Sequence, residues 1–136
     1  MIFIHIKNIL VNGAWGKDEM DINYKMFNKL IYKMKKDFEN ALLYYKNNNI
    51  DIDKALELNP NDSNVYVMRG IMRSELGDND GALADFEYAL KLNPKNSSAY
   101  SMRACIKIAQ GDLKSANEDL EIANNLLEEE EITESK

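Results

Sequence analysis

Side chains that could do chemistry are few in this sequence, and they lie far apart. His5 is the one histidine and Cys105 the one cysteine, whereas metal sites and Ser–His or Cys–His catalysis need several such groups together. Four glutamates at residues 128–131 lack the glycine-containing loop of a calcium site, and no glycine-rich phosphate loop occurs. The sequence therefore predicts a protein that is not an enzyme and that binds no metal and no cofactor.

The single cysteine and the N-terminal residues bear on location. One cysteine forms no intramolecular disulfide, which suits a reducing compartment. The apolar start, MIFIHIKNILV, is interrupted by His5 and Lys7, is followed by no small-residue cleavage site, and is too short to span a bilayer. We expect a cytoplasmic protein that does not enter a membrane, with residues 1–21 as a weakly ordered or strand-like segment.

The charge argues against nucleic acid as a partner. The net charge is −6 and the pI is near 4.8, whereas general nucleic-acid binding depends on a basic surface. Residues 1–50 carry eight basic and five acidic side chains, a net charge of +3, and the remainder carries nine and eighteen, a net charge of −9. The acidic part could attract a basic partner, or it could be an ordinary solvated helical surface.

Two arginines and two aspartates recur at one fixed spacing. Asp85 follows Arg69 by sixteen residues, and Asp119 follows Arg103 by the same number. These side chains could contact a ligand. If each pair instead spans the turn of an antiparallel helical hairpin, its two side chains lie at similar heights and form an ion pair. We favour the ion pair, which specifies the hairpin more surely than it adds net stability.

An internal repeat supplies the elements that must position these pairs. The stretch ALELNP at residues 55–60 returns as ALKLNP at residues 89–94, which is 34 positions later. This register holds through two whole units, and a chance alignment would not hold it over that length. The matches include Ser63 with Ser97, Tyr66 with Tyr100, Gly77 with Gly111, Ala82 with Ala116, and Ala89 with Ala123.

Each unit is patterned as two helices joined by a tight turn. In the first unit, Pro60 precedes a helix that runs to Leu76, with Ser63 as a candidate N-cap. Gly77 permits the left-handed turn that ends this helix, and Asp78 is placed to cap the next one. The second helix carries an apolar stripe at spacings of three and four, made of Ala82, Leu83, Phe86, Ala89 and Leu90.

The pattern resembles the tetratricopeptide repeat, a helical hairpin of 34 residues. The resemblance covers repeats at residues 63–96 and 97–128 of a domain that we place at residues 22–128. It implies an all-α fold in which antiparallel hairpins stack as a short right-handed α-α superhelix. Glu128 stands where the second unit should carry proline. The matching residues are Tyr66, Arg69, Gly70, Gly77, Ala82, Asp85, Phe86, Ala89 and Pro94 in the first repeat, and Tyr100, Arg103, Ala104, Gly111, Ala116, Asp119, Leu120 and Ala123 in the second.

The small residues of this signature predict a close crossing of the two helices. Gly70 or Ala104 on the first helix lets the second helix approach, and a larger side chain there would overpack the crossing by about 1–3 kcal/mol. We therefore expect core roles for these residues.

Resemblance to the family implies a concave surface, made by the first helices of the hairpins, that binds peptides or helices of other proteins. Recognition of a chaperone tail is disfavoured, because Val67, Ser98 and Met102 stand where charged or amide side chains are needed. We expect an adaptor or scaffold that binds an amphipathic helix or an apolar peptide, with Cys105 as a small buried filler. The expected groove residues are Asn64, Val67, Ile71, Ser74, Glu75, Ser98, Ser101, Cys105 and Ile108.

Self-assembly is the alternative function. Fewer than three clear repeats are present, and nothing after Leu127 supplies a polar-faced capping helix. Ile122, Leu126 and Leu127 could stay partly exposed and join two copies as a homodimer through this uncapped C-terminal end. Residues 129–136 are predicted to be an acidic tail.

Residues 22–62 fit the repeat only if seven of them, NNNIDID at residues 47–53, are an insertion. One interpretation is a degenerate repeat with a hairpin at residues 36–37 and the insertion inside its second helix, since seven residues make nearly two helical turns. The other is one long helix over residues 22–46, a break at the asparagines, which are poor helix formers, and a short helix over residues 52–58. We favour the hairpin.

Overall fold

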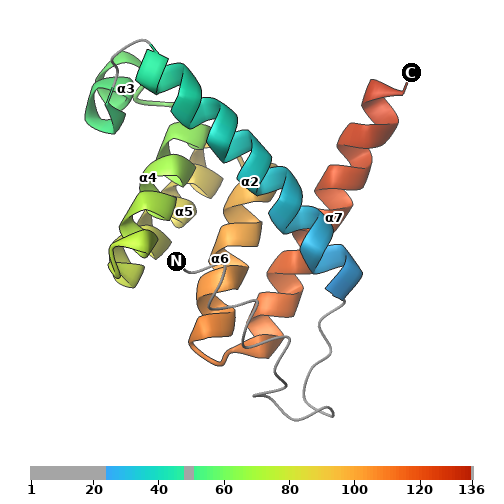
Figure 1. Cartoon of the computed structure of the whole chain (residues 1–136). Coiled ribbons are helices and arrows are strands. Elements are labelled where there is room, and N and C mark those ends of the chain that lie inside the picture. The colour runs from blue at the N-terminus through green and yellow to red at the C-terminus, as the bar shows by residue number, and fades with distance from the viewer. Residues whose placement is uncertain (1–23, 48–50, 136) are drawn as a thin grey trace.

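Helices make up the regular structure of the part of the chain that the structure describes. The computed structural model describes residues 24–47 and 51–135. No strand occurs among these residues, which confirms the predicted all-α class. The helices, shown in Figure 1, are α2 (Tyr24–Asn47), α3 (Ile52–Leu58), α4 (Ser63–Glu75), α5 (Asn79–Leu92), α6 (Ser97–Ala109) and α7 (Leu113–Glu134).

Polar caps set the starts of the four repeat helices. Asp62, Asp78, Asn96 and Asp112 precede α4, α5, α6 and α7, and each side chain accepts a hydrogen bond from a backbone N–H two or three residues later. Ser63, which the sequence suggested as a cap, is instead the first residue of α4, and its Oγ donates to a backbone carbonyl of α5 at 2.8 Å. The cap of α4 is therefore one residue earlier than expected, whereas Asp78 caps α5 as predicted.

Two glycines make the turns of the hairpins, as predicted. Gly77 and Gly111 have φ angles of 86° and 85°, in the left-handed region where a side chain is strained. In both turns the N–H of the following aspartate donates to the carbonyl five residues earlier, at 2.9 Å. The two hairpins therefore turn in the same way.

The body of the molecule consists of two packed hairpins, α4 with α5 and α6 with α7. At the α4–α5 crossing, a Cβ on Gly70 would lie 2.5 Å from Cε1 of Phe86. In the second hairpin Ala104 and Leu120 hold the equivalent positions, and both are fully buried. The predicted close approach of the helices is confirmed at Gly70, which lies directly against the ring of Phe86.

The expected hairpin at residues 36–37 is wrong. Helix α2 continues without interruption from Tyr24 to Asn47, since Lys36 and Asp37 provide neither a glycine nor a proline to end it. A separate short helix, α3, begins after Asp51, whose side chain caps it by accepting from the Lys54 N–H at 2.7 Å. The competing interpretation, one long helix followed by a short helix over residues 52–58, matches the described residues. The break expected at the asparagines falls on residues 48 and 49, which lie outside them.

Helix α2 lies across the two hairpins rather than forming one of its own. Figure 1 shows it running from beside α3, past α4 and α6, to α7. Phe27, Leu30 and Met34 of α2 are buried in the same apolar core as residues of α4, α6 and α7. Helix α2 therefore packs across both hairpins and is not part of a third hairpin stacked on them.

The C-terminal helix is longer than the sequence suggested. Helix α7 runs to Glu134, so most of the predicted acidic tail is helical. Leu127, expected to stay partly exposed, is 3% exposed, whereas Ile122 is 41% exposed. The expectations for residues 1–21, including the strand-like segment and His5, fall outside the described residues. Among the described helices, none is long and apolar enough to cross a membrane.

Candidate functional site

The recurring arginines and aspartates form ion pairs inside the hairpins. Arg69 donates from Nε and Nη2 to the two carboxylate oxygens of Asp85, at 3.0 and 2.8 Å. Arg103 does the same to Asp119, at 2.8 and 2.7 Å. Both carboxylates have only 4% of their side-chain surface exposed. The prediction of an ion pair inside each hairpin is confirmed.

A second cation contacts each of these carboxylates, which the sequence reasoning missed. Nη1 of Arg73 lies 3.1 Å from Asp85, and Nζ of Lys107 lies 2.8 Å from Asp119. Each cation is four residues after the arginine that contacts the same carboxylate, so it lies one turn further along the same helix face. That spacing is the signal that could have revealed the second contacts.

The second repeat shows the electrostatic result of this arrangement. Burial alone would raise the pKa of Asp119, but hydrogen bonds from Arg103 and Lys107 outweigh burial and hold this pKa below its usual value. The same hydrogen bond raises the pKa of Arg103. Asp119 is therefore a charged structural anchor and not a proton donor or acceptor.

A buried polar network joins the two repeats. Nδ2 of Asn96 donates to Oγ of Ser63 at 2.8 Å and to Oδ1 of Asn64 at 2.9 Å, while Oδ1 of Asn96 caps α6. Asn64, expected in the groove, is exposed, and part of its amide is used in this structural contact. Sequence reasoning missed the network because its members are 32 and 33 residues apart.

Most of the expected groove residues are buried. Val67, Ile71, Cys105 and Ile108 belong to the apolar core, and Ser74 and Ser101 are buried beside it. Of the other three, Asn64 and Glu75 are exposed and Ser98 is half-buried. Most of these residues are therefore covered in this structure.

Helix α2 provides the cover. Its apolar residues recur at spacings of three and four, so they form one stripe along the helix. The stripe packs into the core with Val67 and Ile71 of α4 and with the buried residues of α6. Its members are Phe27, Leu30, Ile31, Met34 and Phe38. The spacing was visible in the sequence, but nothing in it indicated which surface the stripe would cover.

Two ion pairs fix α2 to the end of α7. Nζ of Lys29 lies 3.2 Å from Glu131, and Nζ of Lys33 lies 2.6 Å from Glu130. The four side chains are 36–55% exposed, so each pair contributes little more than about 0.5 kcal/mol. The pairs set the position of α2 more than they add to its binding energy.

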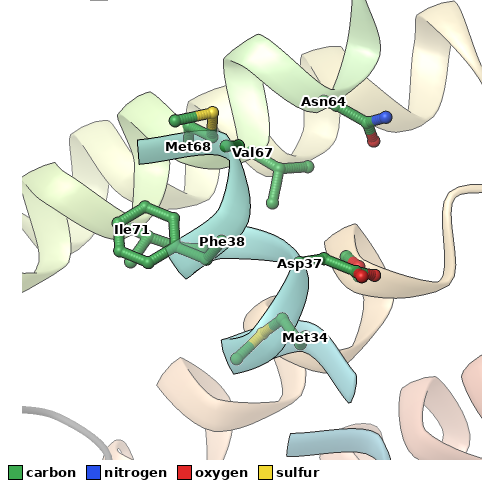
Figure 2. A pocket seen from close by; sticks show the side chains of 9 residues that line it. Met34, Asp37, Phe38, Asn64, Val67, Met68 and Ile71 are labelled. Carbon is green, nitrogen blue, oxygen red and sulfur yellow. The ribbon is translucent and has the colours of Figure 1, made fainter. Parts of the chain in front are cut away.

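Helix α2 does not fill all of the space between itself and α4. A pocket of about 160 Å³ lies between the second half of α2 and α4 (Figure 2). Its apolar lining comes from both helices, and polar side chains stand at the pocket from α2, α4 and α6. The lining residues are Met34, Phe38, Ala41, Val67, Met68 and Ile71, with Asp37, Asn64 and Ser98.

The described residues contain neither an exposed thiol nor a cluster that could bind a metal. Cys105 is fully buried, and burial raises the pKa of its thiol to about 12, so the thiol is inert at neutral pH. No group of three or more His, Cys, Asp or Glu side chains within residues 24–47 and 51–135 could hold a metal ion. Cys105 is the small buried filler that the sequence suggested.

Comparison with known proteins bears on the repeat. Residues 52–84 match the family model described as tetratricopeptide repeat, from α3 through α4 into α5. No curated protein matches the chain. The matched hairpin is followed, 34 positions later, by a second one with the same glycine turn and the same arginine–aspartate pair. Residues 52–84 are therefore similar to a tetratricopeptide repeat, and the second hairpin has the same turn and the same ion pair.

Proposed function

We propose that the chain is a non-catalytic protein–protein interaction module, an adaptor or scaffold that binds a helix or apolar peptide of another protein on its concave surface. The observation that supports this proposal is the amphipathic helix α2, which packs into one apolar core with α4 and α6 and buries Phe27, Leu30 and Met34 there. A surface that holds one amphipathic helix has the shape and the apolar character to hold another.

The family type supports the same function. Tetratricopeptide repeats are generally interaction modules without catalytic activity, and their stacked helices form extended concave surfaces. The nine groove residues expected from the sequence stay a proposal as partner contacts. Val67, Ile71, Cys105 and Ile108 are the four that would meet an apolar face of the partner.

The remaining predictions about partners and location follow from the sequence and are kept as proposals. A net charge of −6 disfavours nucleic acid. A cytoplasmic location suits the single free cysteine. The structure gives less support than the sequence to a homodimer through the C-terminal end, because α2 packs against α7 and Leu127 is buried.

The test is to release α2 without changing the surface beneath it. Leu30→Glu with Met34→Glu places two charges in the buried stripe and should detach α2, because an unpaired buried charge is strongly unfavourable. Cys105 is fully buried in the apolar core that α2 shares, so its reaction with a thiol reagent should become faster when α2 is released. Tyr32→Glu is the matched control, since Tyr32 is 71% exposed on the same helix.

Binding is then measured with a labelled synthetic peptide of residues 24–47, by fluorescence anisotropy. The released protein should bind this peptide in trans, and the Tyr32→Glu protein should bind it less tightly because its own α2 competes. If the released protein remains helical by circular dichroism, exposes Cys105 and still binds no peptide, the concave surface is not a helix-binding site.

A further inference from the structure

The contacts of α2 describe the kind of helix that fits this surface. Building on the proposed function, we propose that the partner is a basic amphipathic helix that displaces α2, with its apolar side chains on α4 and α6 and its basic side chains against Glu130 and Glu131 of α7.

Charge complementarity is the first argument. Helix α2 carries six lysines and two acidic residues, whereas the end of α7 carries the glutamate run at residues 128–131 and Glu134. Lys29 and Lys33 are four residues apart on one face of α2, and they reach Glu131 and Glu130. A helix without basic side chains at these two positions would form no ion pairs with Glu130 and Glu131. An acidic helix would be repelled by them.

The incomplete fit of the second half of α2 is the second argument. The two ion pairs are partly exposed and therefore weak. The pocket beside Ala41 shows that the second half of α2 does not fill the surface of α4. Its volume of about 160 Å³ is similar to that of a cavity that accepts benzene. A partner with a large apolar side chain at this position would fill space that α2 leaves empty.

Together these contacts give a recognition pattern. The partner helix should carry apolar residues at the positions of Phe27, Leu30, Met34 and Phe38, which are spaced by three, four and four. A leucine, methionine or phenylalanine should stand at the position of Ala41. Lysine or arginine should stand two and six residues after the first apolar residue, as Lys29 and Lys33 do after Phe27.

The apparent affinity for such a partner depends on how firmly α2 is held. A partner in trans can bind only those molecules in which α2 has left the surface. The apparent Kd is therefore the intrinsic Kd divided by the fraction of such molecules. Loosening α2 should therefore tighten binding of a partner helix even though no residue of the surface changes. This coupling distinguishes displacement of α2 from binding at some other face.

The test uses the full chain and two labelled probe peptides of residues 24–47. Both carry Ala41→Leu to fill the pocket; the basic probe keeps Lys29 and Lys33, and the acidic probe carries Lys29→Glu and Lys33→Glu. In the chain itself, Lys29→Glu with Lys33→Glu loosens α2 and should tighten binding of the basic probe about fivefold, which is the loss expected for two exposed ion pairs.

The second part of the experiment reverses the charges on α7 instead of those on α2. With Glu130→Lys and Glu131→Lys in the chain, the acidic probe should bind more tightly than the basic probe, which reverses the order found with native α7. The matched control for Lys29→Glu with Lys33→Glu is Lys35→Glu with Lys36→Glu, two exposed lysines of the same helix, α2, with the same change in net charge. This control should leave the affinity for the basic probe unchanged within about twofold.

The outcomes separate the inference from the proposed function. If both probes bind each protein equally, apolar contacts alone select the partner, and the basic partner is ruled out while helix binding stands. If neither probe binds although Cys105 reacts rapidly, both proposals fail. If native chains sediment as a dimer that Glu130→Lys with Glu131→Lys dissociates, the occupant is α2 of a second copy and the separate basic partner is excluded.

Discussion

Asp85 and Asp119 each form ion pairs with two cationic side chains from the first helix of their own hairpin. Both carboxylates are almost fully buried, and each accepts two hydrogen bonds from one guanidinium. The arginine–aspartate spacing of sixteen residues was sufficient to predict the pairs from the sequence. The second cations escaped prediction because Arg73 and Lys107 differ in type, so the repeat does not mark them as equivalent.

Asp119→Asn should destabilise the protein strongly. The neutral amide leaves Arg103 and Lys107 without their shared carboxylate, and removing one partner of a buried ion pair lowers the free energy of unfolding by about 3 kcal/mol. Urea denaturation followed by circular dichroism measures this change. Glu118→Gln, at an exposed position of the same helix, should change the free energy of unfolding by less than about 0.5 kcal/mol. Equal effects of the two substitutions would refute the role of the buried pair.

The pH dependence of stability follows from the same residue. The pKa of Asp119 is lower in the folded state than in the unfolded chain, so the unfolded chain binds the proton more readily. Its contribution is therefore complete above the unfolded pKa of about 3.9 and is lost as the pH falls through the folded pKa. Urea midpoints measured from neutral to acid pH should fall less steeply below that value in Asp119→Asn than in the native chain.

At the level of helices, the two hairpins could be predicted and the place of α2 could not. The 34-residue register, Gly77 and Gly111 define the hairpins locally, and the structure contains them. The apolar stripe of α2 says only that one side is buried, because periodicity identifies a face and not the surface that it meets. The hairpin expected at residues 36–37 failed because the register was extended to a segment that has no turn residue.

The α4–α5 crossing gives a prediction at this level. Gly70→Ala should lower the free energy of unfolding by about 1–3 kcal/mol, because the new methyl group overlaps the ring of Phe86. Phe86→Leu in the same chain should recover part of this loss, since Ala104 and Leu120 already form that combination in the second repeat. The measurement is a double-mutant cycle in urea. Additive effects of the two substitutions would contradict direct contact between the positions.

For the molecule as a whole, the docking of α2 should depend on salt. Raising the NaCl concentration screens the attraction of Lys29 and Lys33 for Glu131 and Glu130, so Cys105 should react faster with a thiol reagent. In a chain with Lys29→Glu and Lys33→Glu the same salt screens a repulsion, and Cys105 should react more slowly. A change of the same sign in both proteins would mean that these charges do not govern the position of α2.

The contact between α2 and α7 also sets an order of events in time. Its ion pairs join residues 97 and 102 positions apart, whereas each hairpin closes over sixteen. Contacts between nearby residues form first in folding because they close smaller loops, and domains begin to fold from the N-terminus during synthesis. Helix α2 is therefore synthesised well before Glu130 and Glu131, with which it forms ion pairs. The apolar stripe of α2 therefore stays uncovered during synthesis at least until α4 and α6, on which it packs, have been translated.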